Sequence, residues 1–159
     1  MLTLKINPKR ISRKKIEIAS KFLKDGKLVA FPTETVYGLG ASVLNRNAIE
    51  RIYDVKGRGK RKPLTIHIAS KEDVNLFAKE IPPIANKLIS LCWPGPLTII
   101  LPKREEVPEE ISPTEKVGLR MPSHPISLSL IGRSGPVVAP SANLSGILAR
   151  QIQRWSLSS

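Results

Sequence analysis

The sequence predicts a single α/β domain in which helices flank a mixed β-sheet. Helical patterns alternate with short apolar strand patterns along the chain, as is typical of a sheet covered by helices. The length of 159 residues suits one domain with a hydrophobic core of its own. Neither an internal repeat nor a long polar linker divides the chain, so we expect one folded unit.

The first half of the chain begins with a helix, a strand and a second helix. The helix expected over residues 12–27 starts at Ser12, a favourable N-cap residue, and stops at Gly26. A short apolar strand follows and ends at Pro32. Residues 45–57 have the spacing of an amphipathic helix that closes on a glycine.

The segment 63–69 has a clear strand pattern. Its side chains alternate, so that one face is apolar and the other carries Thr65 and His67. Ser70 and Asp73 then form a capping-box pattern that opens a third helix, and a pair of prolines begins a fourth. Three more strands are expected at residues 97–101, 117–121 and 136–140, and one further helix at residues 125–132.

The net charge of +13 is a strong compositional signal. Residues 1–62 contain 16 Lys and Arg against 5 Asp and Glu, a balance of +11, whereas residues 63–159 carry only +2. Such a field attracts polyanions such as nucleic acid or nucleotide phosphates. The alternative explanation is a generally basic proteome, in which the charge only aids solubility.

The compartment follows from cysteine content and hydropathy. The single cysteine, Cys92, excludes an intramolecular disulfide and indicates a reducing environment. No stretch reaches the roughly 18 apolar residues that a membrane-spanning helix needs. The first residues lack the apolar core of a secretory signal. We therefore expect a cytoplasmic protein without a membrane partner.

Polar side chains gather directly after the first strand. Hydroxyl groups and a carboxylate precede two glycines that permit close backbone approach: Thr33, Glu34, Thr35, Tyr37, Gly38 and Gly40. This pattern suits a site for a small polar ligand. A glycine-rich turn with surface threonines explains it equally well.

A basic run precedes the strand at 63–69. Asp54 is the only acid near its five cations, and two glycines leave the backbone free to wrap phosphate oxygens. The cations are Lys56, Arg58, Lys60, Arg61 and Lys62. The run lacks the Gly-Lys-Ser/Thr sequence of a Walker motif. It indicates either a phosphate or nucleic-acid site or a solvated loop.

Further candidate site residues lie on or after the later strands. A lone histidine is usually structural, but His67 shares a strand face with Thr65 close to the basic run. Arg120 ends a strand, where its planar guanidinium could grip a carboxylate with two hydrogen bonds. Ser141 and Asn143 follow a buried strand and offer donors to a phosphate or a nucleobase.

We expect neither a metal centre nor a catalytic triad. The second histidine, His124, stands apart from His67, and no Cys or carboxylate cluster has the spacing of metal ligands. The sequence lacks a Gly-x-Ser-x-Gly elbow, and Ser141 has no evident His–Asp relay. Nucleophilic catalysis is therefore not indicated.

Five segments in this order resemble the YrdC-type L-threonylcarbamoyladenylate synthases. They are FPTETVYGLGA, IYDVKGRGKRKPLTIHI, CWPGPLTIIL, VGLRMPSHP and APSANLSG. The resemblance runs from about residue 12 to Gly146 and includes a Lys-x-Arg and Ser-x-Asn signature at Lys56, Arg58, Ser141 and Asn143. Five segments in register are far more specific than any one of them.

The resemblance implies a nucleotidyltransferase and a twisted sheet whose concave, positively charged face holds the substrates. The enzyme would condense L-threonine, bicarbonate and ATP, with Mg²⁺, into L-threonylcarbamoyl-AMP and pyrophosphate. Partner tRNA-modification proteins would use the product for N6-threonylcarbamoyladenosine in tRNA. The alternative is a non-catalytic protein of the same fold that binds tRNA or double-stranded RNA. A related carbamoyl-adenylate domain of hydrogenase maturation factors is disfavoured, because zinc-finger and acylphosphatase segments are missing.

The same resemblance assigns roles to individual residues. It places three side chains around threonine, with the guanidinium on the threonine carboxylate: Thr33, His67 and Arg120. It places two catalytic cations, Lys56 and Arg58, on the ATP phosphates. Three further residues would contact the nucleotide: Lys62, Ser141 and Asn143. Catalysis would rest on positioning and on neutralising the charge that builds at the α-phosphate.

The sequence departs from the family pattern in two places. Lys116 stands where many members have a small hydroxyl residue near the nucleotide. After Gly146 the family's C-terminal segment is replaced by an unrelated one. We therefore expect a YrdC-like domain over 1–146 and a divergent, truncated tail over 147–159, with a loss of stability and activity.

Overall fold

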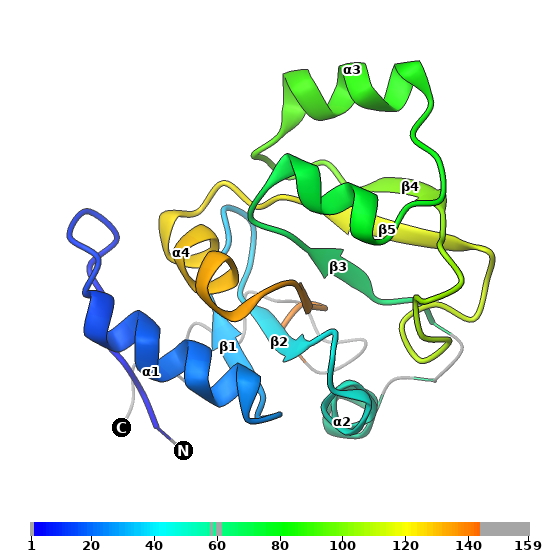
Figure 1. Cartoon of the computed structure of the whole chain (residues 1–159). Coiled ribbons are helices and arrows are strands. Elements are labelled where there is room, and N and C mark those ends of the chain that lie inside the picture. Colours follow the sequence, from blue (N-terminus) through cyan, green and yellow to red (C-terminus); the bar gives the residue numbers. More distant parts are fainter. Residues whose placement is uncertain (1, 58, 60–61, 144–159) are drawn as a thin grey trace.

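The computed structural model describes residues 2–57, 59 and 62–143. Within them, one mixed sheet has the strand order β1-β2-β6-β3-β5-β4 (Figure 1). The strands are β1 (Val29–Phe31), β2 (Gly38–Ser42), β3 (Thr65–His67), β4 (Ile99–Pro102), β5 (Lys116–Arg120) and β6 (Val137–Val138). The helices are α1 (Arg13–Lys24), α2 (Arg46–Lys56), the 3₁₀-helix η1 (Lys71–Leu76), α3 (Pro83–Cys92) and α4 (Pro125–Ser134). The predicted α/β class is confirmed.

Local sequence signals account for several helix ends. The Ser12 hydroxyl accepts a hydrogen bond from the Lys15 backbone N–H and caps α1. Gly57 ends α2 in the left-handed region, at φ +56°. The capping box of Ser70 and Asp73 is present, but it opens a short 3₁₀-helix rather than an α-helix.

The pairing of β3 decides where the polar side chains meet. β3 runs parallel to β5 and antiparallel to β6, and all other strand pairs are antiparallel. In the β3–β5 register, Thr65 lies opposite Gly118 and His67 lies opposite Arg120. Residues that pair in register on neighbouring strands point to the same face of a sheet. The polar face predicted for residues 63–69 therefore continues into β5.

Two hydrophobic clusters hold the sheet from different sides. The helices α1 and α4 lie side by side (Figure 1), and they share a small cluster with β1 that includes Leu23, Phe31, Leu130 and Ile131. The larger cluster joins β3, β4 and β5 to α2, η1 and α3, and includes Ile49, Ile66, Val74, Ile89 and Leu119. Burial of these side chains fixes the strands whose ends carry the polar residues.

The strand β2 is an element that the sequence pattern missed. Its residues read as a glycine-rich turn, yet they pair with β1 and β6 in the sheet. A Cβ atom added to Gly40 would lie 2.7 Å from the Phe31 ring. The glycine thus serves close packing within the sheet, which a local pattern does not reveal.

Some predictions fall outside the described residues. Arg58 and the tail at 147–159 are among them, as is the end of the YrdC-like domain predicted for 1–146. In the part of the chain that is described, no helix is long and apolar enough to cross a membrane.

Candidate functional site

A cavity of about 210 Å³ is lined by the loop after β1, by β3 and by the end of β5. It is lined by residues from segments far apart in the chain, among them Thr33, Thr35, His67, Arg120 and Ser141. We call it the β3–β5 cavity. All three residues expected around threonine line this cavity, although 87 positions separate Thr33 from Arg120.

The Arg120 guanidinium is held by two side chains of the loop after β1. Its Nη2 atom donates to Glu34 Oε1 at 2.5 Å and to Thr35 Oγ1 at 3.0 Å. Only 15% of the Arg120 side chain is exposed. Its Nε atom is buried and has no hydrogen-bond partner among the described residues. A buried donor without an acceptor is costly, and the two bonds of Nη2 hold the guanidinium in this position.

Glu34 uses both of its carboxylate oxygens in this arrangement. While Oε1 accepts from Arg120, Oε2 accepts the backbone N–H of Ser123 at 3.1 Å. Burial raises the pKa of Glu34, but the hydrogen bond of Arg120, the backbone N–H groups and the positive charge of Arg120 together outweigh burial, and the pKa is lowered from its ordinary value. Glu34 therefore stays ionised at neutral pH. It links the loop after β1 to the loop after β5.

His67 is a neutral group in the cavity wall. Burial, followed by the positive charge of Arg120, lowers its pKa to about 4. Its Nδ1 atom lies 3.4 Å from the Thr65 carbonyl oxygen. At neutral pH the imidazole carries no charge, so it can take part in hydrogen bonds to a ligand without adding to the charge of Arg120.

The Thr33 hydroxyl organises its own loop. It donates to the Val36 carbonyl at 2.5 Å and accepts the backbone N–H groups of Thr35 and Val36, each at 3.2 Å. These bonds shape the turn that presents Thr35 and Glu34 to Arg120. A direct role of Thr33 in ligand binding stays a prediction.

Lys56 is drawn into the protein instead of pointing to solvent. It is 4% exposed, and its ammonium group donates to the backbone carbonyls of Ser141 and Asn143. Lys62, by contrast, is exposed. The basic run is thus divided, because one of its cations binds the segment after β6 and another faces water. Contacts of these residues with a nucleotide stay predictions.

The segment after β6 also bonds to the cavity wall. The backbone N–H of Ala142 donates to the Tyr37 carbonyl at 2.7 Å, and Ser141 forms a β-bridge with Gly38. Together with the Lys56 ammonium, these bonds place Ser141 and Asn143 beside the residues after β1. The two halves of the Lys-x-Arg and Ser-x-Asn signature therefore meet at Lys56 and Ser141.

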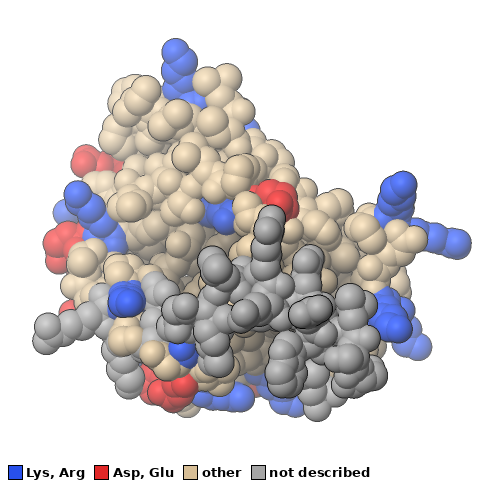
Figure 2. Space-filling view, turned by 180° about the vertical axis from the view of Figure 1, so that it is seen from behind, with Lys and Arg blue, Asp and Glu red and all other residues tan. Residues whose placement is uncertain are grey.

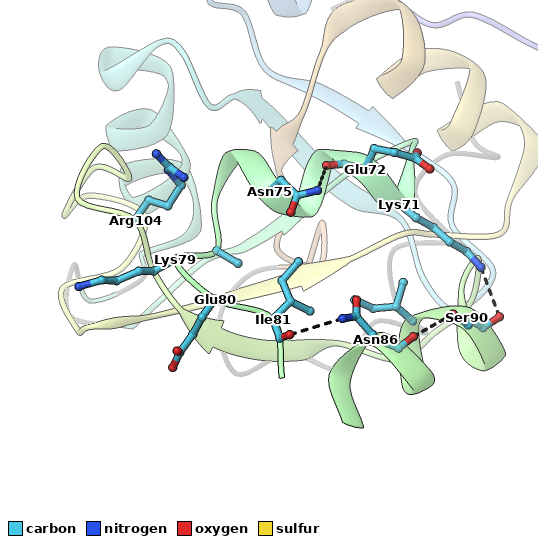
Figure 3. A pocket seen from close by; sticks show the side chains of 11 residues that line it. Lys71, Glu72, Asn75, Lys79, Glu80, Ile81, Asn86, Ser90 and Arg104 are labelled. Carbon is cyan, nitrogen blue, oxygen red and sulfur yellow. Dashed lines mark hydrogen bonds between the residues drawn. The ribbon is translucent and has the colours of Figure 1, made fainter. Parts of the chain in front are cut away.

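A larger cavity of about 560 Å³ lies between η1 and α3 (Figure 3). We call it the η1–α3 cavity. Three of its polar side chains bond to nearby backbone: Asn86 to the Ile81 carbonyl, Asn75 to the Glu72 carbonyl, and Lys71 to the Ser90 carbonyl. None of the predicted site residues lines it. The smaller β3–β5 cavity is the better candidate, because the predicted residues Thr33, His67, Arg120 and Ser141 line it.

The charged side chains and the potential metal ligands are spread over the molecule. Figure 2 shows Lys and Arg side chains in several separate groups on one face of the molecule, with acidic side chains near some of them. The concave, positively charged face stays a prediction. Among the described residues, no three His, Cys, Asp or Glu side chains are grouped to hold a metal ion. His124 caps α4, since its Nδ1 accepts the Ile126 N–H.

Two residues that shape this site received no individual role from the sequence pattern. Glu34 was visible as the single acid within a polar cluster, but its partner Arg120 lies 86 positions away. Thr98 lines the cavity from the segment before β4 and gave no signal, since it is a lone threonine beside an apolar strand. Both acquire their place through strand order, which the sequence pattern does not supply.

Comparisons with known proteins show which family this chain belongs to. A threonylcarbamoyl-AMP synthase of Pyrococcus abyssi is 54% identical over 148 residues, which make up 91% of this chain and 44% of the relative. A threonylcarbamoyl-AMP synthase of Bacillus subtilis is 46% identical over 134 residues, 80% of this chain and 38% of the relative. The chain therefore spans less than half the length of these two relatives.

Solved structures give the same result. The crystal structure of P. abyssi Sua5 complexed with L-threonine is 54% identical, with a TM-score of 0.86 over 88% of this chain and 42% of that one. E. coli YciO is 25% identical, with a TM-score of 0.82 over 94% of this chain and 76% of that one. The Sua5/YciO/YrdC family model, described as "Telomere recombination", matches residues 21–153. The chain belongs to the Sua5/YciO/YrdC family.

Proposed function

We propose that this chain carries a threonylcarbamoyl-AMP synthase activity. It would condense L-threonine, bicarbonate and ATP into L-threonylcarbamoyl-AMP and pyrophosphate, as a step toward N6-threonylcarbamoyladenosine in tRNA. Curated relatives at 54% and 46% identity bear the name of this activity. Partner tRNA-modification proteins would consume the adenylate.

The buried guanidinium in the β3–β5 cavity is the observation that carries the proposal. A cavity of about 210 Å³ is the size for a small ligand, and its wall combines the Arg120 donor with threonine hydroxyls. L-Threonine has a carboxylate for Arg120 and a hydroxyl and an amine for the neighbouring polar groups. The P. abyssi relative was solved with L-threonine bound, which supports the assignment of this ligand.

The reaction asks the protein for positioning and charge more than for a nucleophile. The threonine amine adds to bicarbonate to give a carbamate and water. A carbamate oxygen then forms a bond to the α-phosphorus of ATP as the bond to pyrophosphate breaks. In this proposal Arg120 holds the threonine carboxylate, while the neutral His67 and Thr33 lie around the amino acid.

The nucleotide would lie next to the segment after β6. Ser141 and Asn143 would contact it, and Lys56, Arg58 and Lys62 would neutralise its phosphates. Because Lys56 bonds to the carbonyls of Ser141 and Asn143, it also sets the shape of that segment. Mg²⁺ would enter with ATP as part of the substrate, since the ion usually binds through phosphates and few protein ligands.

Pyrophosphate release tests the activity directly. The chain is mixed with ATP, Mg²⁺ and bicarbonate, with and without L-threonine, and the adenylate is sought by mass spectrometry. We expect pyrophosphate and the adenylate only when threonine is present. Pyrophosphate release that does not depend on threonine, or no release at all, would contradict the proposal.

RNA binding is a second proposed property, favoured by the net charge of +13. We expect the affinity for tRNA or duplex RNA to fall steeply as salt rises, because phosphate contacts release counterions. RNA binding without any adenylate formation would favour the non-catalytic alternative. Binding that does not respond to salt would contradict an electrostatic interface.

A further inference from the structure

Glu34 contacts Arg120 without lining the β3–β5 cavity. Its two oxygens accept from two different segments, the Arg120 guanidinium in β5 and the Ser123 N–H in the following loop. Only 19% of the Glu34 side chain is exposed. Glu34 is absent from the residues that line the β3–β5 cavity, whereas Thr35 and Arg120 are among them. The carboxylate therefore supports the cavity wall without being part of it.

The bonds of Arg120 fix the orientation of its guanidinium. The group is planar, with its donors in a rigid fork. Two acceptors, Glu34 Oε1 and Thr35 Oγ1, occupy Nη2 and so restrict how the plane can turn. The buried Nε–H has no acceptor among the described residues. An arginine held in this way is prepared for an anionic group and does not have to be reoriented when that group arrives.

We infer that Glu34 is a positioning residue that orients Arg120, so that the guanidinium presents its remaining N–H groups to the α-carboxylate of a free amino acid. The inference rests on the proposed function, in which that amino acid is L-threonine. Glu34 does not touch the ligand in this account. It acts through Arg120 and fixes the loops after β1 and β5 relative to each other.

The competing explanation is an ion pair that only stabilises the fold. The chain offers a matched example, because Glu17 and Arg133 form a pair of 2.7 Å on the surface, with 62% and 51% of their side chains exposed. A merely structural Glu34 would affect every ligand of the cavity equally. A positioning Glu34 affects only ligands that have a carboxylate for Arg120.

The test compares two ligands and three proteins by NMR titration of the whole chain. L-Threonine and L-threoninol share the amine and the side-chain hydroxyl, but threoninol has an alcohol in place of the carboxylate. For Glu34→Gln we expect about tenfold weaker L-threonine binding, the usual effect of losing a hydrogen bond to a charged group. Threoninol binding should not change. Glu17→Gln should bind both ligands like the unchanged chain.

Two further variants keep the test decisive. Thr35→Ala removes the other acceptor of Nη2 and should weaken L-threonine binding in the same selective way, even if Glu34→Gln folds poorly. In an Arg120→Ala background, Glu34→Gln should cause no additional loss of L-threonine affinity, because the group it positions is gone.

Three results would overturn the inference. They are an equal loss for both ligands in Glu34→Gln and Thr35→Ala, unchanged L-threonine binding, or tighter binding, which would make Glu34 a competitor of the carboxylate. If the unchanged chain binds L-threonine normally in these cases, the inference about Glu34 fails alone. If the unchanged chain does not bind L-threonine, the proposed function fails and the inference falls with it.

Discussion

The two cavities of this molecule differ in how far their ionisable side chains are buried. The η1–α3 cavity is the larger, at about 560 Å³ against about 210 Å³, but most of its ionisable side chains are exposed: Glu72, Lys79, Glu80 and Arg104. The β3–β5 cavity contains a buried arginine donor with no partner among the described residues and a neutral buried histidine. A largely buried arginine and a buried histidine in the wall, more than volume, mark a place prepared for a ligand.

The largest effect is expected from Arg120→Ala. The substitution removes the group that would bind the ligand carboxylate and leaves Glu34 without its charged partner. We expect threonine-dependent pyrophosphate release to fall by about 100-fold or more, the scale of breaking a largely buried charge pair. Arg133→Ala removes a surface arginine instead and should leave the rate unchanged. Equal rates for the two variants would contradict the comparison.

The next effect concerns the pH dependence of stability. The pKa of His67 is about 4 in the folded chain, against an ordinary value of 6.5. Below pH 6.5 the unfolded chain therefore binds a proton that the folded chain refuses, and stability falls until pH 4. The loss should approach about 3 kcal/mol. The unfolding free energy is measured by denaturant at several pH values between 6.5 and 4. It should fall more steeply with pH in the unchanged chain than in His67→Gln, and identical pH profiles would contradict a buried neutral His67.

Lys56→Met should have a somewhat smaller effect on stability. It removes the ammonium group that binds the carbonyls of Ser141 and Asn143. Leaving such acceptors without their charged donor costs about 2 kcal/mol, measurable by urea unfolding. Lys62→Met is the control, because Lys62 is exposed and its loss should change the unfolding free energy little. A similar loss in both variants would show that Lys56 has no special structural role.

The smallest effect is expected in the η1–α3 cavity. Asn86→Ala removes a long hydrogen bond of 3.4 Å from an exposed side chain. The unfolding free energy should change by less than about 0.5 kcal/mol, and threonine-dependent pyrophosphate release should not change. A marked loss of activity would indicate that the functional site lies at the η1–α3 cavity and not at the β3–β5 cavity.

Local sequence signals predicted much of this fold. Ser12, Gly57 and the alternation of residues 63–69 act through bonds within a few residues, so their effects can be inferred from neighbours in the chain. β2 escaped prediction because Gly40 is needed for the close approach of the Phe31 ring. Such packing depends on which strands become neighbours.

The site was predictable in its members but not in its connections. Thr33, His67 and Arg120 were expected in one place, and they line one cavity. The bond between Glu34 and Arg120 joins residues 86 positions apart, and it requires β5 to pair with β3 at the centre of the sheet. The inward turn of Lys56 likewise depends on carbonyls that β6 brings near the end of α2.

The most direct test is a titration of the ¹⁵N-labelled chain with L-threonine. If the β3–β5 cavity is the binding site, the amide shifts that change should belong to residues 33–38, 65–67 and 118–120. Amides of residues 71–90, around the η1–α3 cavity, should stay in place. Changes confined to residues 71–90, or no changes at millimolar threonine, would contradict the account.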